Sequence, residues 1–265
     1  MRNVPADLFR LVTDGDCAKE LAVGTRFDRE RETFPGWIKQ QVVKLACASL
    51  VQTPFYLILD TDIFLANKAS VKDLFRESDC TSYSAVCDPD KLVSFQAKND
   101  MYPLANRSSH QLAWTQNSAH LLQLDVPLDW RIAMGVTPQI MATDIALGLA
   151  NFIQERFKLP SWQAFLLESL TWHQIDYKAS GMEWTPPWTE YTLYWIYASH
   201  ACILDDYHTP AEVLQQNAVW GLDDFKAWNA CKDTFNNGQA YFSLVQSRWQ
   251  LDPDLIWKKI KPCLA

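Results

Sequence analysis

Two carboxylates at the end of an apolar segment are the residues of this chain best suited to chemistry. The segment Phe55–Leu65 reads FYLILDTDIFL, and Asp60 and Asp62 interrupt it two residues apart. A carboxylate is costly to ionise inside an apolar core, so we expect both at the open end of a buried strand. Their oxygens suit Mn²⁺ or Mg²⁺, which proteins usually hold with one or two carboxylates and the phosphates of a substrate. The pair therefore predicts a metal site for a substrate that carries phosphate.

The Asp-x-Asp spacing alone is weak evidence, because the chain contains three more such pairs. Those pairs lie in polar or proline-containing stretches, where Asp commonly bonds to its own backbone in a turn. They are Asp14/Asp16, Asp88/Asp90 and Asp252/Asp254. The surrounding Leu, Ile and aromatic residues single out Asp60/Asp62.

A helix predicted over residues 36–51 leads directly into this strand and carries polar side chains. Lys44 is the best of them for a diphosphate, because its ammonium is a compact point charge. Trp37, Gln40 and Gln41 are the other candidates for binding the donor. Alternatively, these polar side chains form an ordinary solvated helix face. The sequence of the helix taken alone favours this interpretation.

A second informative segment follows the double proline at residues 186–187. Thr189 is suited to cap a helix, and Glu190 falls in the first turn of that helix. A carboxylate there commonly complements the helix dipole. It could also serve as a general base at the rim of a cleft, free of the core. The flanking aromatics Trp184, Trp188 and Tyr191 would then suit the face of an acceptor sugar, although most Trp residues are expected in a core.

Other catalytic and metal motifs are weak. The five His residues form no metal-binding spacing, and only His208, beside Asp205 and Asp206, is a candidate late metal ligand. The sequence has no Gly-x-Ser-x-Gly, Walker or Rossmann glycine pattern.

The composition of the chain limits its class, its partners and its cellular compartment. With 265 residues, 48% apolar, the chain can bury a sizeable core, and its net charge of -7 argues against nucleic acid as a partner. Seven Cys without a Cys-x-x-Cys suggest neither a disulfide framework nor a zinc ribbon, so a reducing compartment fits best. Without a signal peptide or an apolar segment of membrane length, we expect a soluble, cytoplasmic protein with no transmembrane segment.

The predicted elements indicate an α/β fold with a largely parallel sheet. Strands are expected at residues 55–60, 82–86, 120–124 and 241–246, with a polar loop around 99–111. Helices are expected at 36–51, 70–76, 143–157, 161–170, 189–199 and 253–260, with Ser70, Thr143, Ser161 and Thr189 as starting or capping residues. Residues 1–265 are interpreted as one domain.

Several of these segments together resemble a family of bacterial glycosyltransferases with the GT-A fold, mostly unassigned in substrate. The resemblance runs from GWIKQQVVKL at residues 36–45 through YLILDTD at 56–62 to TEYTLY at 189–194. Thr137-Pro138-Gln139 and Ser161-Trp162 also fit the pattern. The match covers roughly residues 34–200 in order.

The resemblance implies a GT-A-like, Rossmann-type mixed sheet flanked by helices, and transfer of a sugar from a nucleotide-sugar donor to a glycan or other hydroxyl acceptor. It implies that Asp60 and Asp62 hold Mn²⁺ or Mg²⁺ against the donor diphosphate and that Glu190 is the base. Only about 35 residues precede the matching helix, so the strand and loop that usually hold the nucleoside are expected to be truncated. A C-terminal metal ligand is open between His208 and the Gln246–Ser247 region.

Two alternatives remain. A haloacid-dehalogenase-like phosphatase also places Asp-x-Asp after an apolar strand, but Phe64 stands where its motif has Thr or Val. A non-catalytic descendant that binds a sugar or a partner protein is the other alternative.

Overall fold

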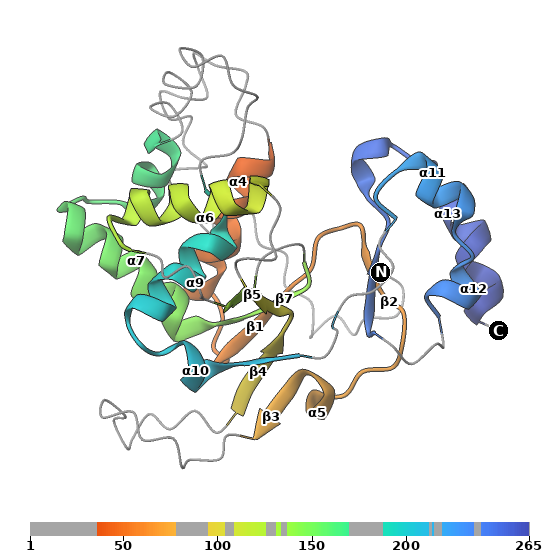
Figure 1. Ribbon diagram of the computed structural model, residues 1–265, viewed down its shortest axis with the longest axis horizontal. Helices are drawn as coiled ribbons and strands as arrows, with labels where there is room; N and C mark the ends of the chain where they lie inside the picture. Colours follow the sequence, from red (N-terminus) through yellow and green to blue (C-terminus); the bar gives the residue numbers. More distant parts are fainter. Residues whose placement is uncertain are drawn as a thin grey trace. The chain divides into compact units, whose positions relative to one another are not determined.

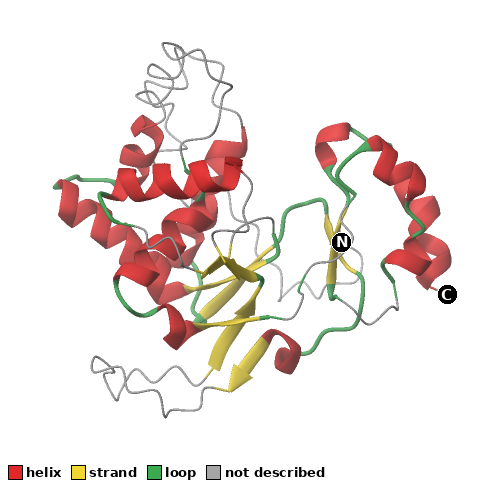
Figure 2. Cartoon of the chain, in the orientation of Figure 1, coloured by secondary structure: helices red, strands yellow, loops and turns green. Residues whose placement is uncertain are grey.

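The computed structural model describes residues 36–77, 95–103, 109–125, 131–133, 137–169, 188–211, 214, 219–235 and 240–264. These residues group into two compact units, each assembled from several parts of the chain. The first unit consists of helices, and the second contains every described strand (Figure 1 and Figure 2). The protein is therefore mixed α/β, as predicted, while the GT-A arrangement and the single domain over residues 1–265 stay predictions.

Apart from α6, which the sequence did not predict, the described helices of the first unit follow the predicted pattern closely. They are α4 (Gly36–Ala46) with the 3-10 helix η2 (Cys47–Ser49), α6 (Ser109–Leu122), α7 (Thr143–Phe157), a helix over 162–169, and α9 (Glu190–His200). In α7 the buried stripe is Ile145, Leu149 and Ile153, four residues apart, as expected for one apolar face. The residues of α9 from Glu190 to Ile196 are all buried, on every side of the helix, which marks it as the central helix of this unit.

Short polar side chains begin these helices in different ways. Ser161 accepts a hydrogen bond from the Ala164 backbone N–H at 3.1 Å, so it caps its helix as predicted. Thr143 is instead the first residue of α7, and its hydroxyl donates to the Thr53 carbonyl at 2.7 Å. Thr143 thereby ties the start of α7 to the segment after η2.

The predicted strand at residues 120–124 is wrong. Residues 120–122 are the last of α6, and 123–124 follow it. The buried positions of α6 recur with helical spacing: Thr115, Ser118, Ala119 and Leu122. A short apolar run cannot be assigned to strand or helix by its composition alone. The predicted strand at 82–86 lies outside the described residues.

The second unit contains short strands joined mostly in pairs. They are β1 (Phe55–Ile58), β2 (Ile63–Leu65), β3 (Phe75–Glu77), β4 (Phe95–Asn99), β5 (Met101–Pro103), β6 (Arg131–Ala133), β7 (Gln139–Ala142), β8 (His208–Pro210) and β9 (Phe242–Leu244). The pairs β1–β7, β2–β9, β3–β4 and β5–β6 are antiparallel, and among the described strands only β4–β8 is parallel.

The described strands therefore do not form the largely parallel sheet that was predicted. Parallel neighbours need a crossover of about a dozen residues or more, usually a helix. The helix after β1 and β2 is α5 (Val71–Leu74), only four residues long, and it runs directly into the antiparallel pair β3–β4. The expected loop around residues 99–111 also differs, because Asn99 ends β4 and residues 109–111 begin α6.

The C-terminal part of the second unit has its own apolar cluster. The helices here are α10 (Leu204–Tyr207), α11 (Leu222–Ala227), α12 (Ala230–Asp233), η5 (Ser247–Trp249), α13 (Pro253–Ile260) and η6 (Lys261–Leu264). Phe225, Trp228, Phe235 and Ile260 pack together in this cluster with Phe64 at its margin. Asp252 caps α13 by accepting from the Asp254 N–H, which confirms the predicted backbone role of that Asp-x-Asp pair.

The structure contradicts the expectation that the cysteines form no disulfide. Cys231 in α12 and Cys263 in η6 are disulfide-bonded, and Cys263 belongs to the buried cluster. Cys47 and Cys202 are not disulfide-bonded. In the described part of the chain, no helix combines the length and apolarity needed to span a membrane.

Candidate functional site

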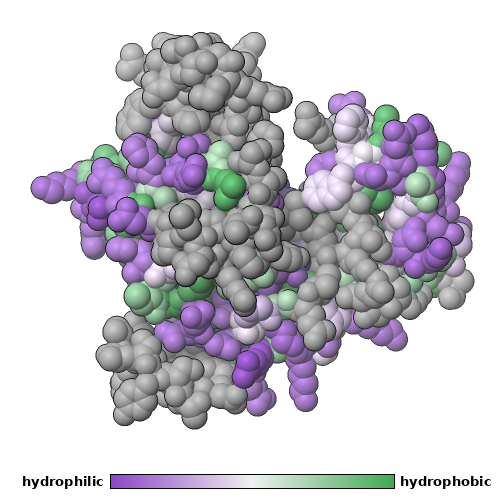
Figure 3. Space-filling view, viewed as in Figure 1, coloured by the Kyte–Doolittle hydropathy of each residue, from purple (hydrophilic) through white to green (hydrophobic). Residues whose placement is uncertain are grey.

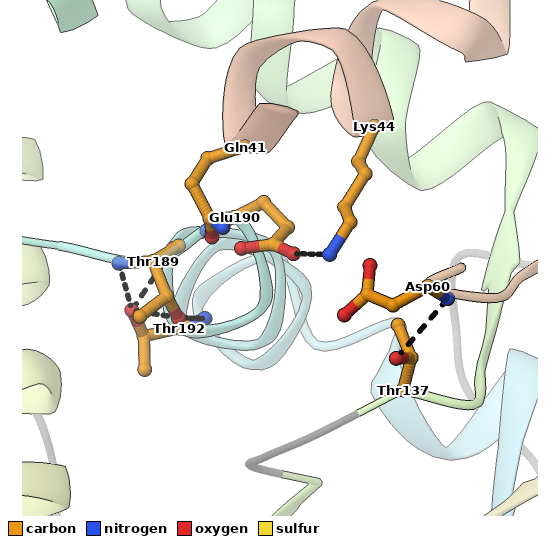
Figure 4. Close-up of polar contacts among 7 residues, drawn as sticks. All are labelled: Gln41, Lys44, Asp60, Thr137, Thr189, Glu190 and Thr192. Atoms are coloured by element: carbon orange, nitrogen blue, oxygen red, sulfur yellow. Dashed lines mark hydrogen bonds and ion pairs between the residues drawn. The ribbon is translucent and has the colours of Figure 1, made fainter. Parts of the chain in front are cut away.

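Asp60 and Asp62 lie in the tight turn between β1 and β2, which confirms their predicted position just beyond a strand. The Ile63 N–H donates to the Asp60 carbonyl at 3.1 Å and closes this turn. The Asp60 N–H donates to Thr137 Oγ1 at 3.3 Å, just before the partner strand β7 (Figure 4). The turn is thus anchored to the start of β7.

Among the described residues, the Asp62 carboxylate is held from one side only. Its Oδ2 accepts the Ser247 backbone N–H at 3.0 Å, and its own carbonyl accepts the Val245 N–H at the same distance. Its Oδ1 is buried and has no hydrogen-bond partner among the described residues. A buried carboxylate oxygen without a partner is costly, and a bound cation would remove that cost.

Gln139 provides a second unpartnered oxygen on the β1–β7 ladder. Gln139 pairs with Ile58, the last residue of β1, and residues directly opposite in an antiparallel ladder share one face. Its side chain is 2% exposed, and its Oε1 has no partner within the described residues. Sequence reasoning placed Gln139 in the family pattern but assigned it no role.

Carboxylate and amide oxygens are the types of ligand that Mn²⁺ and Mg²⁺ prefer. The described residues contain no group of three or more His, Cys, Asp or Glu side chains that could hold a metal ion. Mg²⁺ does not need such a group, because it usually keeps several waters and binds through one or two carboxylates with substrate phosphates. Asp60 and Asp62 fit a metal that arrives with its diphosphate.

His208 lies at the other end of β1. It is 2% exposed, and its Nδ1 lies 3.0 Å from the Asn99 side-chain nitrogen. Its ring packs against Phe55, the first residue of β1, at 6.5 Å between centroids. Five residues of strand span roughly 17 Å, so this packing argues against His208 as a ligand beside Asp60. Burial lowers the pKa of His208 to about 3, and the imidazole is therefore neutral in the folded protein.

In the first unit, Lys44 and Glu190 form a buried ion pair. Lys44 Nζ lies 3.0 Å from Glu190 Oε1, and the two side chains are only 9% and 1% exposed (Figure 4). The Lys44 ammonium also lies 5.3 Å from the centre of the Tyr191 ring. The solvated-face interpretation of Lys44 is therefore wrong, and so is the expected position of Glu190 at an open rim, because α9 is buried around its first turn.

The other donor-binding candidates in α4 differ in their burial and contacts. Gln41 is 2% exposed and lies against Glu190, whose backbone N–H donates to Gln41 Oε1 at 3.3 Å. In the other amide orientation, the Gln41 nitrogen donates to the Glu190 carboxylate instead. Gln40 is half-buried, and the side chain of Trp37 lies outside the described residues.

The predicted acceptor aromatics are core residues where they are described. Trp188 is 2% exposed and donates from Nε1 to Ser169 Oγ at 3.0 Å, and Tyr191 is 3% exposed. Neither offers a face to a sugar, because both pack inside the helical unit. Trp184 lies outside the described residues.

Sequence reasoning missed two features of the second unit. The contact between Asp62 and Ser247 joins residues 185 positions apart, and the only signal for it was the weak expectation of a ligand near Gln246–Ser247. The exposed indoles of Trp220 and Trp249 carried no signal at all. Composition predicts that a Trp is mostly buried, and it cannot tell which one is not.

Comparisons with known proteins identify the family but no characterised relative. Neither the curated proteins nor the solved structures contain a match to this chain. A family model matches residues 10–265, which is nearly the whole sequence. The chain belongs to this family, which is described as a family of unknown function (DUF6492).

Proposed function

We propose that the protein is a metal-dependent glycosyltransferase that moves a sugar from a nucleotide-sugar donor to a hydroxyl group of a glycan or other acceptor. The observation that carries the proposal is the turn after β1, where Asp60 and Asp62 follow an apolar strand and Asp62 Oδ1 is buried without a described partner. The resemblance of residues 34–200 to GT-A glycosyltransferases supports the same chemistry.

Asp60 and Asp62 would hold Mn²⁺ or Mg²⁺. When bound, the metal would neutralise the negative charge that develops on the leaving nucleoside diphosphate. The Ser247 N–H keeps the Asp62 carboxylate oriented through Oδ2 and leaves Oδ1 for the cation. The Asp60 N–H donates to Thr137 Oγ1, and this bond holds the turn in place through the backbone.

Glu190 stays the candidate base, and Lys44 stays a candidate phosphate contact. Their ion pair limits both roles, because each charge already neutralises the other in a buried setting. For Glu190 to accept the acceptor proton, its carboxylate would have to leave Lys44. A structural role for the pair is therefore the simpler interpretation, and the metal site does not depend on it.

The test is a donor screen with the purified chain, a panel of nucleotide sugars and Mn²⁺, followed by release of nucleoside diphosphate. Asp62→Asn keeps the shape of the side chain and removes its charge, and should lower release roughly 10²-fold or more. Asp223→Asn is the matched control, because Asp223 is 95% exposed and its loss should leave the rate unchanged.

Two outcomes would overturn this function. Trapping of the protein by beryllium fluoride with rapid turnover of a generic phosphomonoester would identify Asp60 as a phosphatase nucleophile. Saturable donor binding with no diphosphate release, for any acceptor or for water, would indicate a non-catalytic sugar-binding protein.

A further inference from the structure

Two exposed indoles lie next to the turn that orients Asp62. Trp220 is 44% and Trp249 is 47% exposed, whereas Trp188, Trp195 and Trp228 are at most 6% exposed. Large aromatic side chains are usually buried because they have much apolar surface to remove from water. Two exposed indoles on neighbouring segments therefore need a reason.

The two Trp residues are held in place by backbone bonds. Val219 bridges to Val245, and the Gln246 N–H donates to the Val219 carbonyl at 2.9 Å, so the segments that precede the two indoles run side by side. Trp249 Nε1 donates to the Trp220 carbonyl, which joins the pair directly. The Trp220 N–H donates to Asp224 Oδ2 at 3.1 Å. The indoles are thus fixed on a preformed surface.

This surface is continuous with the candidate metal turn. Ser247, which donates to the Asp62 carboxylate, and Trp249 belong to the same three-residue 3-10 helix η5. A 3-10 helix rises about 2 Å per residue, so Trp249 begins within about 4 Å along the axis from Ser247. Trp249 is therefore close along the chain to the residue that holds the Asp62 carboxylate.

The surroundings favour a sugar over an apolar partner. Over α11 and α13, the visible face is mostly hydrophilic (Figure 3), although these helices also carry the exposed apolar side chains of Leu222, Leu255 and Trp257. Protein interfaces are built around larger apolar centres. Two aromatic faces among carboxylates and backbone polar groups match the chemistry of a sugar ring, which has an apolar C–H face and a rim of hydroxyls.

We propose that Trp220 and Trp249 form a carbohydrate-binding subsite that receives the acceptor glycan. The identity of the bound sugar as acceptor rests on the proposed function, whereas the binding of a sugar ring does not. This subsite replaces the aromatic role that the sequence suggested for Trp188 and Tyr191, which are buried.

The experiment measures binding of maltose, cellobiose, lactose and diacetylchitobiose to the whole chain by calorimetry, without metal or nucleotide. We expect saturable binding of at least one of these sugars. Trp249→Ala and Trp220→Ala should each weaken it roughly five- to tenfold, because each removes one stacking face. Trp257→Ala is the matched control, since Trp257 is 52% exposed on α13 and lies outside the pair. It should leave binding unchanged.

Trp249→Phe separates stacking from folding, because it keeps a ring but loses the bond to the Trp220 carbonyl. It should retain part of the affinity, and loss equal to that of Trp249→Ala with an unchanged melting temperature would contradict stacking. Absence of binding by all four sugars, or equal weakening by Trp257→Ala, would overturn the subsite. A change in oligomeric state on removing both indoles, without an effect on sugar binding, would assign the surface to a second copy of the chain.

The same variants distinguish this inference from the proposed function. Stabilisation by Mn²⁺ with a nucleoside diphosphate should persist in Trp249→Ala, because the indole is not a ligand. If the protein binds metal and diphosphate but no sugar, only the proposed subsite is contradicted. If the protein binds a sugar but is not stabilised by metal and diphosphate, only the proposed transferase function is contradicted.

Discussion

Asp62 and Glu190 are two acidic residues with opposite surroundings. Glu190 is engaged by the Lys44 ammonium and is almost completely buried, whereas Asp62 has one oxygen tied to Ser247 and the other without a described partner. A buried charge with its counterion is neutralised and adds little chemistry. A carboxylate with one oxygen that has no described partner is the better ligand, and the proposed metal site is therefore built on Asp62 with its neighbour Asp60.

Breaking the Lys44–Glu190 pair should be strongly destabilising. Lys44→Met or Glu190→Gln removes one charge of this buried pair, and we expect each to lower the free energy of unfolding by about 3 to 5 kcal/mol. The double variant should recover much of that loss, because neither charge remains. Urea denaturation of the four proteins measures the coupling. Additive losses in the double variant would show that the two side chains do not act as a pair.

The catalytic role of Glu190 can be tested in the same Glu190→Gln protein. If Glu190 is the base, transfer should fall roughly 10²-fold or more while metal and diphosphate binding persist. Near-normal turnover in the folded fraction would remove Glu190 from the mechanism and leave it as the partner of Lys44.

Among the elements, α9 depends on a buried capping box. Thr189 Oγ1 accepts the Thr192 N–H at 3.1 Å, Thr192 Oγ1 accepts the Thr189 N–H at 3.0 Å, and Thr192 also bonds Ser118 Oγ in α6 at 2.6 Å. We expect Thr189→Ala to cost about 1 to 2 kcal/mol of unfolding free energy. Ser70→Ala, in the exposed motif with Asp73 at α5, should cost less. Chemical denaturation measures both losses of unfolding free energy. Equal losses for Thr189→Ala and Ser70→Ala would contradict the expectation that the buried capping box contributes more.

The ladder β4–β8 should make stability depend on pH through His208. The pKa of His208 is lowered to about 3 by burial, below the ordinary value of 6.5. Between these values the unfolded chain binds a proton that the folded chain does not, so stability falls as pH decreases. The slope from this one group is about 1.4 kcal/mol per pH unit. His208→Gln should flatten the stability profile between pH 6 and about 4, and an unchanged profile would show that His208 does not carry it.

Local sequence signals predicted elements better than their pairing. Caps and apolar periodicity placed α7, α9 and α13 within a few residues, because those signals act over one or two turns. The antiparallel pairing of β1 with β7, and the contact of Asp62 with Ser247, join distant segments and leave no local pattern. The burial of Glu190 was missed for the same reason, since its partner Lys44 lies on another helix.

At the scale of the whole molecule, the Cys231–Cys263 disulfide closes a long loop. The two residues are 32 positions apart, and a cross-link of that span should stabilise the fold by about 3 to 4 kcal/mol in the chain-entropy description. Replacing both Cys with Ser should lower the free energy of unfolding by that order. Cys202→Ser, at an exposed free thiol, is the control. An equal stability in reductant and oxidant would contradict the cross-link and favour the reducing compartment predicted from the sequence.

The central claim, that Asp60 and Asp62 bind a divalent cation together with a diphosphate, is tested most directly by thermal shift. Wild-type protein is melted with nucleoside diphosphates and nucleotide sugars, each with and without Mn²⁺. A ligand at about a hundred times its Kd should raise the melting temperature by roughly 5 to 10 °C, and only when Mn²⁺ is present. Asp62→Asn should abolish this shift, and Asp223→Asn should keep it. A shift that survives in Asp62→Asn, or that needs no metal, would contradict the assignment.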